Sequence, residues 1–250
     1  MQAIKNLTDE LKLGAFYDAL QEQLTQSIYD DIPFKERIFS LLQAESITRH
    51  NRRIAQLQKE AKLHEKSARF EAIDFSTSRG LHKPMLIDLF SNDYLQHHRN
   101  IILTGPTGTG KSYIAQALAN KAMTHGHSAL YLRVPRLMQL LSSSRGDDEY
   151  LKTLARIKRI KLLILDDFGV SPLKASEARD LLEIVEDRTN NASLIITSQL
   201  HIADWHSHLH NPTIADAILD RIVHNAYKIE LKGESQRKLK SKAKEEEISG

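Results

Sequence analysis

Five short apolar runs occur from residue 101 onward, and stretches with helical periodicity lie between them. The apolar runs cover residues 101–103, 129–134, 162–165, 194–197 and 226–231, and the helical stretches lie around 112–124, 136–158, 174–190 and 213–223. Strands that alternate with helices predict a parallel sheet with crossover connections, and apolar runs without polar alternation are typical of strands buried on both faces. We therefore expect an α/β domain with a five-stranded parallel sheet.

The first seventy residues show helical spacing instead, with no strand pattern. One helical stretch is interrupted at Gly14, and a second opens at Pro33 and continues to about Lys66. The sequence thus predicts four parts: an all-α N-terminal domain over residues 1–70, a linker with an entry helix over 71–98, an α/β core over 99–232 and a basic tail over 233–250.

Composition narrows the class of protein. The chain has 250 residues, 41% hydrophobic and 27% charged, which is typical of a globular protein. It has no cysteine, which excludes disulfides, thiol chemistry and Cys-ligated zinc. No apolar run approaches the length of a membrane span, and the first six residues lack the apolar core of a signal peptide. We therefore expect no membrane association and a cytoplasmic location.

Residues 105–112, Gly-Pro-Thr-Gly-Thr-Gly-Lys-Ser, follow the first apolar run and match the Walker A pattern of a phosphate-binding loop. In this Walker A pattern the glycines let backbone N–H groups surround the β-phosphate, Lys111 reaches the β- and γ-phosphates, and the Ser112 hydroxyl ligates Mg²⁺. The helix that follows adds the positive end of its dipole. We expect ATP to bind to Gly105, Pro106, Thr107, Gly108, Thr109, Gly110, Lys111, Ser112 and Tyr113.

The third apolar run, 162–165, ends in two carboxylates, which is the form of a Walker B element. Asp166 at the end of a strand is suited to hold Mg²⁺ through its hydration shell, because Mg²⁺ prefers oxygen ligands and keeps water. Asp167 is then positioned to orient or deprotonate the attacking water. The fourth run ends in Ser198 and Gln199, either of which can sense the γ-phosphate; ordinary capping of the strand end is the alternative.

Three arginines are candidates to neutralise charge in the transition state, namely Arg188, Arg221 and Arg237. Arg221 follows a helix and precedes the last strand, where an arginine can project toward the γ-phosphate bound by a neighbouring subunit. The alternative is an intrachain ion pair with Asp216 or Asp220.

Basic side chains gather on two helical stretches. The first, within 49–69, is opposed only by Glu60 and Glu65, and the second precedes the Walker B strand within 152–161. Neither is interleaved with the aromatic residues expected of single-strand stacking platforms, which favours contact with duplex phosphates. A solvated helix face or an acidic protein partner is the alternative. The candidate DNA contacts are Arg49, Arg52, Arg53, Lys59, Arg156 and Arg159.

Together these motifs resemble the IstB family, AAA+ helper ATPases encoded beside an integrase-type transposase in bacterial insertion sequences. The resemblance covers nearly the whole chain. It rests on residues 34–37, 45–53, 105–112, 162–168, 197–199, 204–206, 212–221, 224–226 and 233–237. It implies an AAA+ core, ATP-dependent self-assembly into a homo-oligomer on double-stranded DNA, selection of a target site and stimulation of a cognate IstA-like transposase.

Two other functions compete with this one. Helicase loaders of the DnaC type share the P-loop core, and a small-molecule kinase is a third possibility that the Asp166–Asp167 pair disfavours, because two acids suit water activation. Gln236 stands where the IstB family typically has Met, and nineteen residues follow Leu231. We therefore expect the C-terminal lid of AAA+ proteins to be reduced or absent, which leaves Arg237 without an assigned role as a sensor.

Overall fold

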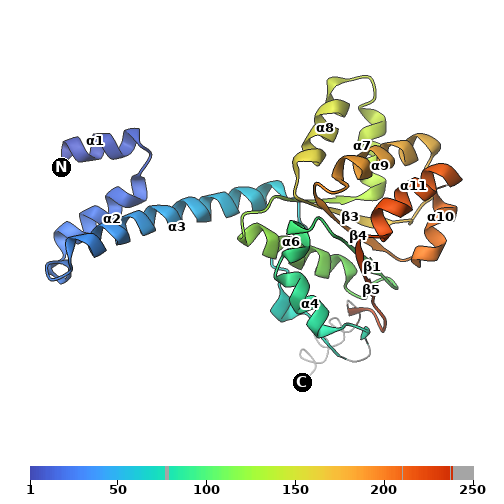
Figure 1. Cartoon of the computed structure of the whole chain (residues 1–250), viewed down its shortest axis with the longest axis horizontal. Coiled ribbons are helices and arrows are strands. Elements are labelled where there is room, and N and C mark those ends of the chain that lie inside the picture. The colour runs from blue at the N-terminus through green and yellow to red at the C-terminus, as the bar shows by residue number, and fades with distance from the viewer. Residues whose placement is uncertain (77–78, 210, 237, 239–250) are drawn as a thin grey trace. The chain divides into compact units, whose positions relative to one another are not determined.

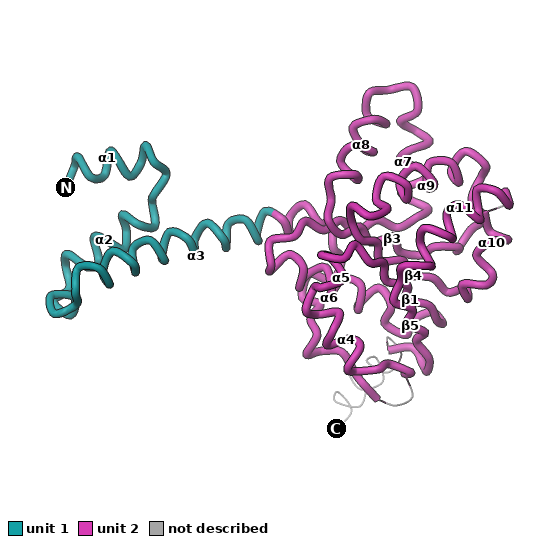
Figure 2. The backbone as a smooth tube through the Cα atoms, in the orientation of Figure 1, with its two compact units in different colours: residues 1–56 teal, residues 57–250 magenta. Residues whose placement is uncertain are grey.

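The computed structural model describes residues 1–250 except 77–78, 210, 237 and 239–250. The chain forms two compact units, residues 1–56 and 57–250, shown in teal and magenta in Figure 2. Residues 57–70, which the sequence prediction groups with the N-terminal domain, therefore pack within the second unit. Arg237 and most of the predicted basic tail lie outside the described residues.

The first unit is helical. It contains α1 (Gln2–Glu10), α2 (Gly14–Thr25), the 3₁₀ turn η1 (Ser27–Tyr29) and most of α3 (Phe34–Glu60). The expected interruption before α2 is present. The buried carboxylate of Glu45 from α3 caps the start of α2 by accepting the Ala15 and Phe16 N–H groups at 3.0 and 3.2 Å. Helix α3 ends six residues before the predicted end, near Lys62, whose positive φ of 55° departs from helical geometry.

The second unit holds the predicted five-stranded parallel sheet, in the order β2-β3-β4-β1-β5. Its strands and helices appear in Figure 1. The strands are β1 (Asn100–Thr104), β2 (Ala129–Arg133), β3 (Leu162–Phe168), β4 (Ser193–Ser198) and β5 (Ala226–Glu230). The helices are α4 (Lys83–Phe90), α5 (Asp93–Gln96), α6 (Lys111–Thr124), α7 (Val134–Ser143), α8 (Asp148–Arg159), α9 (Ala175–Arg188), α10 (Trp205–His208) and α11 (Pro212–Val223), with 3₁₀ turns η2 (Phe70–Ala72) and η4 (Ile202–Asp204).

Each face of the sheet is covered by its own apolar cluster. Ile101 and Leu103 of β1 pack with α4, α5 and α6 on one face, whereas Ile102 packs with α7 to α11 on the other. The central strands β3, β4 and β1 are therefore apolar at successive positions rather than at alternate ones, as the sequence predicts. This arrangement brings the carboxyl ends of all five strands to one edge of the sheet, where α6 begins.

One predicted helical stretch, 136–158, is divided into α7 and α8. The break falls at residues 144–147, where Gly146 adopts a φ of +106°. No helix among the described residues is long and apolar enough to cross a membrane.

Candidate nucleotide site

The phosphate-binding loop joins the end of β1 to the start of α6. Lys111 is 8% exposed, and its ammonium group donates to the carbonyls of Gly105 at 2.6 Å and Pro106 at 2.8 Å. Burial lowers the pKa of Lys111, while the negative charges of Asp166 and Asp167 oppose that shift. The lysine thus lies inside the loop, held by carbonyl oxygens that a phosphate group can replace.

Two glycines of the loop have another segment packed against them. A Cβ atom on Gly105, at φ +136°, would lie 2.1 Å from the carbonyl oxygen of Leu231, and one on Gly108, at φ +84°, would lie 2.2 Å from the hydroxyl of Ser235. The Gln236 N–H also donates to the Gly108 carbonyl at 2.9 Å. The residues that follow β5 therefore lie directly on the loop, and these two positions require glycine.

A buried arginine from the predicted linker supports the same loop. Arg79 is 5% exposed, and its guanidinium donates to the carbonyls of Thr109 and Asp74. The Lys232 N–H donates to the Arg79 carbonyl at 2.9 Å, which connects this arginine to the segment after β5. Sequence reasoning did not single out Arg79, because a lone arginine in a polar stretch carries no local signal.

Asp166 lies near the carboxyl end of β3, is 3% exposed, and accepts hydrogen bonds from three hydroxyl groups. Ser112 of the loop donates at 2.7 Å, and Tyr131 of β2 and Thr197 of β4 also donate. The structure therefore joins the two predicted metal ligands, Ser112 and Asp166, directly. The hydroxyls of Tyr131 and Thr197 were not predicted, since both residues belong to runs that look like ordinary buried strands.

A bulge in β3 re-aims Asp167. Leu165 pairs with Ile196 and Phe168 with Ser198, so three steps along β3 match two along β4. Asp167 has a φ of +61° at this extra residue. In a regular strand the side chains of Asp166 and Asp167 would point to opposite faces of the sheet. The bulge changes the direction of the Asp167 side chain, which contacts Arg133 of β2.

The Asp167 side chain is held in an ion pair. The Arg133 Nε donates to one Asp167 carboxylate oxygen at 2.7 Å. That hydrogen bond raises the pKa of Arg133, so the guanidinium is charged. Arg133 and Tyr131 are two residues apart on β2, and each contacts one of the two Walker B carboxylates.

The two candidate sensors differ in what they contact. Ser198 is fully buried, donates to the Phe168 carbonyl at 2.7 Å and accepts the Leu200 N–H at 3.1 Å. Gln199 is exposed, and its side-chain carbonyl accepts the hydroxyl of Thr107, in the phosphate-binding loop, at 2.7 Å.

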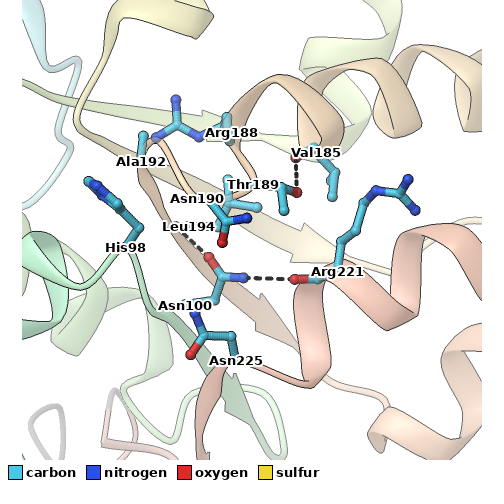
Figure 3. Close-up of a pocket in the computed structure, with 10 residues that line it drawn as sticks. All are labelled: His98, Asn100, Val185, Arg188, Thr189, Asn190, Ala192, Leu194, Arg221 and Asn225. Carbon is cyan, nitrogen blue, oxygen red and sulfur yellow. Dashed lines mark hydrogen bonds between the residues drawn. The ribbon is translucent and has the colours of Figure 1, made fainter.

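Arg221 lies far from the loop of its own chain. The side chain of Asn100, the first residue of β1, donates to the Arg221 carbonyl at 3.3 Å, whereas the loop follows the other end of β1. Five strand residues span roughly 16 Å. Figure 3 shows the Arg221 side chain directed away from Asn100 and Asn225, at the amino ends of the strands.

The guanidinium of Arg221 is bound within the chain. It donates to the Ala217 carbonyl at 2.8 Å and forms an ion pair with Glu186 of α9 at 2.9 Å. The sequence interpretation named Asp216 and Asp220 as ion-pair partners, but the partner in the structure is Glu186. The second arginine, Arg188, is 1% exposed and donates to three backbone carbonyls, which is a structural role.

The candidate DNA contacts are exposed on two helices, and some already have partners within the chain. Arg49 pairs with Glu45 at 2.7 Å, and Arg156 donates to the Glu60 carbonyl at 3.4 Å. On α3 the spacing of three and four residues places several basic side chains on one helix face. All six are exposed: Arg49, Arg52, Arg53 and Lys59 on α3, and Arg156 and Arg159 on α8.

The arrangement can bind a triphosphate with a divalent cation. The Ser112 hydroxyl and the Asp166 carboxylate are hard oxygen donors 2.7 Å apart beside the phosphate loop, which is the donor set that Mg²⁺ prefers. Among the described residues no group of three or more His, Cys, Asp or Glu side chains forms another cation site. The parallel sheet, the phosphate loop and the paired acids at one sheet edge define a P-loop nucleotide-binding protein.

Comparison with known proteins assigns the family. The model of the IstB-like ATP binding protein family matches residues 6–244, and the chain belongs to that family. The insertion sequence ATP-binding protein y4pL of Sinorhizobium fredii is 41% identical over 220 residues, which cover 88% of this chain and 89% of that protein. The ATP-binding protein of insertion sequence IS21 from Pseudomonas aeruginosa is 30% identical over 98% of this chain and 91% of its own length.

Solved structures share the fold. The crystal structure of DnaI matches with a TM-score of 0.58 and 23% identity, covering 71% of this chain and 93% of that chain. The crystal structure of the DnaC helicase loader matches with a TM-score of 0.57 and 18% identity, covering 66% of this chain and 97% of that chain. At these identities the likeness supports the fold of the α/β core alone.

Proposed function

We propose that this protein is an ATPase that assembles on duplex DNA when it binds ATP and assists the transposase of an insertion sequence in target selection and transposition. The supporting observation is the phosphate loop joined to Asp166 through Ser112, in a chain whose relatives are named as ATP-binding proteins of insertion sequences. The partners are double-stranded DNA, an IstA-like transposase and further copies of this chain. The cofactors are ATP and Mg²⁺.

Binding begins in the loop. Lys111 exchanges the Gly105 and Pro106 carbonyls for oxygens of the β- and γ-phosphates, while N–H groups of the loop and of the first turn of α6, up to Tyr113, donate to the phosphates. Mg²⁺, when bound, neutralises phosphate charge and orients the γ-phosphate. Ser112 and Asp166 are the residues that would hold it.

Hydrolysis requires a water in line with the γ-phosphate. Asp167 accepts a proton from that water while the water oxygen attacks the γ-phosphorus. The bond between the γ-phosphorus and the leaving ADP oxygen breaks in the same step. One carboxylate oxygen of Asp167 is engaged by Arg133, which leaves the other to face the water. We assign the γ-phosphate sensor to Gln199, because it contacts Thr107 of the loop, whereas the Ser198 hydroxyl is satisfied by backbone groups.

Arg221 acts on a neighbouring subunit. It lies at the amino ends of the strands and is bound to Glu186, so it does not approach the phosphates of its own chain. In an assembly Arg221 would leave Glu186 and neutralise charge on the γ-phosphate bound by the neighbouring subunit. Hydrolysis and assembly are then interdependent.

Duplex DNA contacts the basic faces of α3 and α8. Exposed arginine and lysine side chains bind phosphates by charge and release counterions, so binding depends on salt and little on base sequence. Arg49 is held by Glu45, so Arg52, Lys59 and Arg159 contribute charge more freely.

The direct test is assembly on DNA. The wild type and Lys111→Ala are mixed with duplex or single-stranded DNA, with and without ATP, and the mass of the complexes is measured by analytical ultracentrifugation. Large assemblies of the wild type on duplex, dependent on ATP and absent in Lys111→Ala, support the proposal. Assemblies restricted to single strands would support the helicase-loader alternative, and nucleotide-independent complexes would contradict both.

A further inference from the structure

Strand β2 contributes a buried phenol to the cation site. Tyr131 is 5% exposed, and its hydroxyl donates to one carboxylate oxygen of Asp166. The other carboxylate oxygen accepts the hydroxyls of Ser112 and Thr197. Asp166 is thus fixed from three elements, β2, β4 and α6, although each donor is a neutral side chain.

The three donors differ in what they can do when a cation binds. The Ser112 hydroxyl can donate its proton to Asp166 while its lone pair faces the cation, so the direction of that lone pair depends on where Asp166 lies. Tyr131 and Thr197 lie on strands rather than on the phosphate loop, and they reach the site through Asp166. Their hydrogen bonds therefore set the position of the carboxylate, and the carboxylate sets the position of Ser112.

The surroundings of Tyr131 keep its hydroxyl in place. Its backbone N–H donates to the Ala61 carbonyl at 2.8 Å, and its ring packs edge-on against His64, with ring centroids 5.1 Å apart. The Asp166 carboxylate is the hydrogen-bond acceptor for this buried hydroxyl. A tyrosine in a buried edge strand needs such a partner for its hydroxyl.

We propose that Tyr131 is a positioning residue for the divalent cation of this site, acting through Asp166 on Ser112. The inference rests on the proposed nucleotide function and adds a residue outside the phosphate loop and the paired acids. Outer partners of ligating carboxylates typically change metal affinity by roughly 10- to 100-fold when they are removed. Tyr131 should therefore affect cation binding more than nucleotide binding.

The experiment uses Mn²⁺ as the probe, because its free form is counted by electron paramagnetic resonance. Full-length wild type, Tyr131→Phe and the control Tyr150→Phe are saturated with a non-hydrolysable ATP analogue and titrated with Mn²⁺. Tyr150 is a matched control, since its hydroxyl also donates to a carboxylate, that of Asp180 at 3.0 Å, away from the loop. Affinity for the analogue is also measured in chelator, without any cation.

Tyr131→Phe should raise the dissociation constant for Mn²⁺ about 10-fold, leave analogue affinity without cation within about twofold, and differ from Tyr150→Phe, which should match the wild type. An unchanged Mn²⁺ constant would overturn the inference, as would an equal loss of analogue affinity without cation. If Tyr131→Phe did not fold, Thr197→Val would remove another hydrogen bond to Asp166, from β4. It should likewise raise the dissociation constant for Mn²⁺ and leave analogue affinity without cation unchanged, and the opposite results would overturn the inference. If the wild type bound Mn²⁺ and analogue no better than Lys111→Ala, the proposed function itself would fail.

Discussion

The two compact units bury their apolar residues very differently. In residues 57–250 apolar side chains from both faces of the sheet form two large clusters, and Ile101, Ile164 and Ile195 are fully buried. In residues 1–56, all of which the structure describes, Leu41 is the single buried apolar side chain. Large apolar side chains there are mostly exposed: Ile4, Leu7, Leu11, Leu24, Ile28, Phe34, Phe39, Leu42 and Ile47.

This difference separates two kinds of role. The nucleotide site is built on strand ends that a complete core holds rigid, which suits a site whose atoms must be placed accurately. The first unit is held by polar contacts between its helices, such as the Glu45 cap on α2, and most of its large apolar side chains lie on the surface. Substitutions of buried residues in the second unit should therefore affect fold or chemistry, and substitutions of exposed residues in the first should affect binding.

The largest effect is expected for Arg221→Ala. Removing an arginine finger typically lowers the hydrolysis rate by roughly 10³-fold or more, while ATP affinity should stay close to that of the wild type. Steady-state ATPase assays and nucleotide binding measure the two separately.

A mixture then tests action between subunits. Arg221→Ala has intact paired acids, and Asp167→Asn has an intact arginine, so mixed assemblies should recover part of the missing activity. If mixed assemblies were verified and recovered no activity, Arg221 would be a structural partner of Glu186. The second unit would then hydrolyse ATP without help from a neighbouring subunit.

A smaller effect is expected from core truncation, and it tests the contrast in burial itself. Ile164→Ala removes a fully buried side chain of β3 and should cost about 2–5 kcal/mol of unfolding free energy. Phe39→Ala removes a side chain that is 66% exposed and should cost less than about 0.5 kcal/mol. Urea unfolding of both variants gives the values, and similar costs would show that the first unit has a core of its own.

The smallest effect concerns the basic face of α3. Combining Arg49→Ala, Arg52→Ala and Arg53→Ala should flatten the slope of log affinity for duplex DNA against log salt by about 0.9 for each DNA phosphate that the variant no longer neutralises. ATP affinity should remain within about twofold, because the nucleotide site lies wholly in the second unit and these arginines lie in the first. An unchanged slope would move the DNA surface to α8, with Arg156 and Arg159 as the next residues to replace.

Much of the nucleotide site could be predicted from local patterns. The phosphate loop and the acids of β3 depend on residues close together in sequence, and the buried strands show as continuous apolar runs. The five strands and their parallel pairing agree with the structure, whereas the order of the strands in the sheet was not predicted. The division between α7 and α8 was missed, because Gly146 sits in a stretch whose helical spacing continues on both sides.

The interactions around the site could not be predicted, because they depend on tertiary pairing. The bulge that turns Asp167 toward Arg133 arises from the register between β3 and β4, and no local signal reveals it. The packing of Ser235 on Gly108 joins residues far apart in sequence. Arg79 and Tyr131 likewise look like ordinary linker and strand residues until their partners are known.

We propose that ATP binding at the loop forms the DNA-bound assembly and that hydrolysis through Asp167 ends it. The most direct measurement is the lifetime of assemblies on labelled duplex DNA after free ATP is removed, for wild type and Asp167→Asn. Loss of a general base typically slows its step by roughly 10²- to 10⁴-fold. Asp167→Asn assemblies should therefore form normally and persist far longer than those of the wild type. Equal lifetimes would show that hydrolysis at this site does not control the assembly and would contradict this proposal.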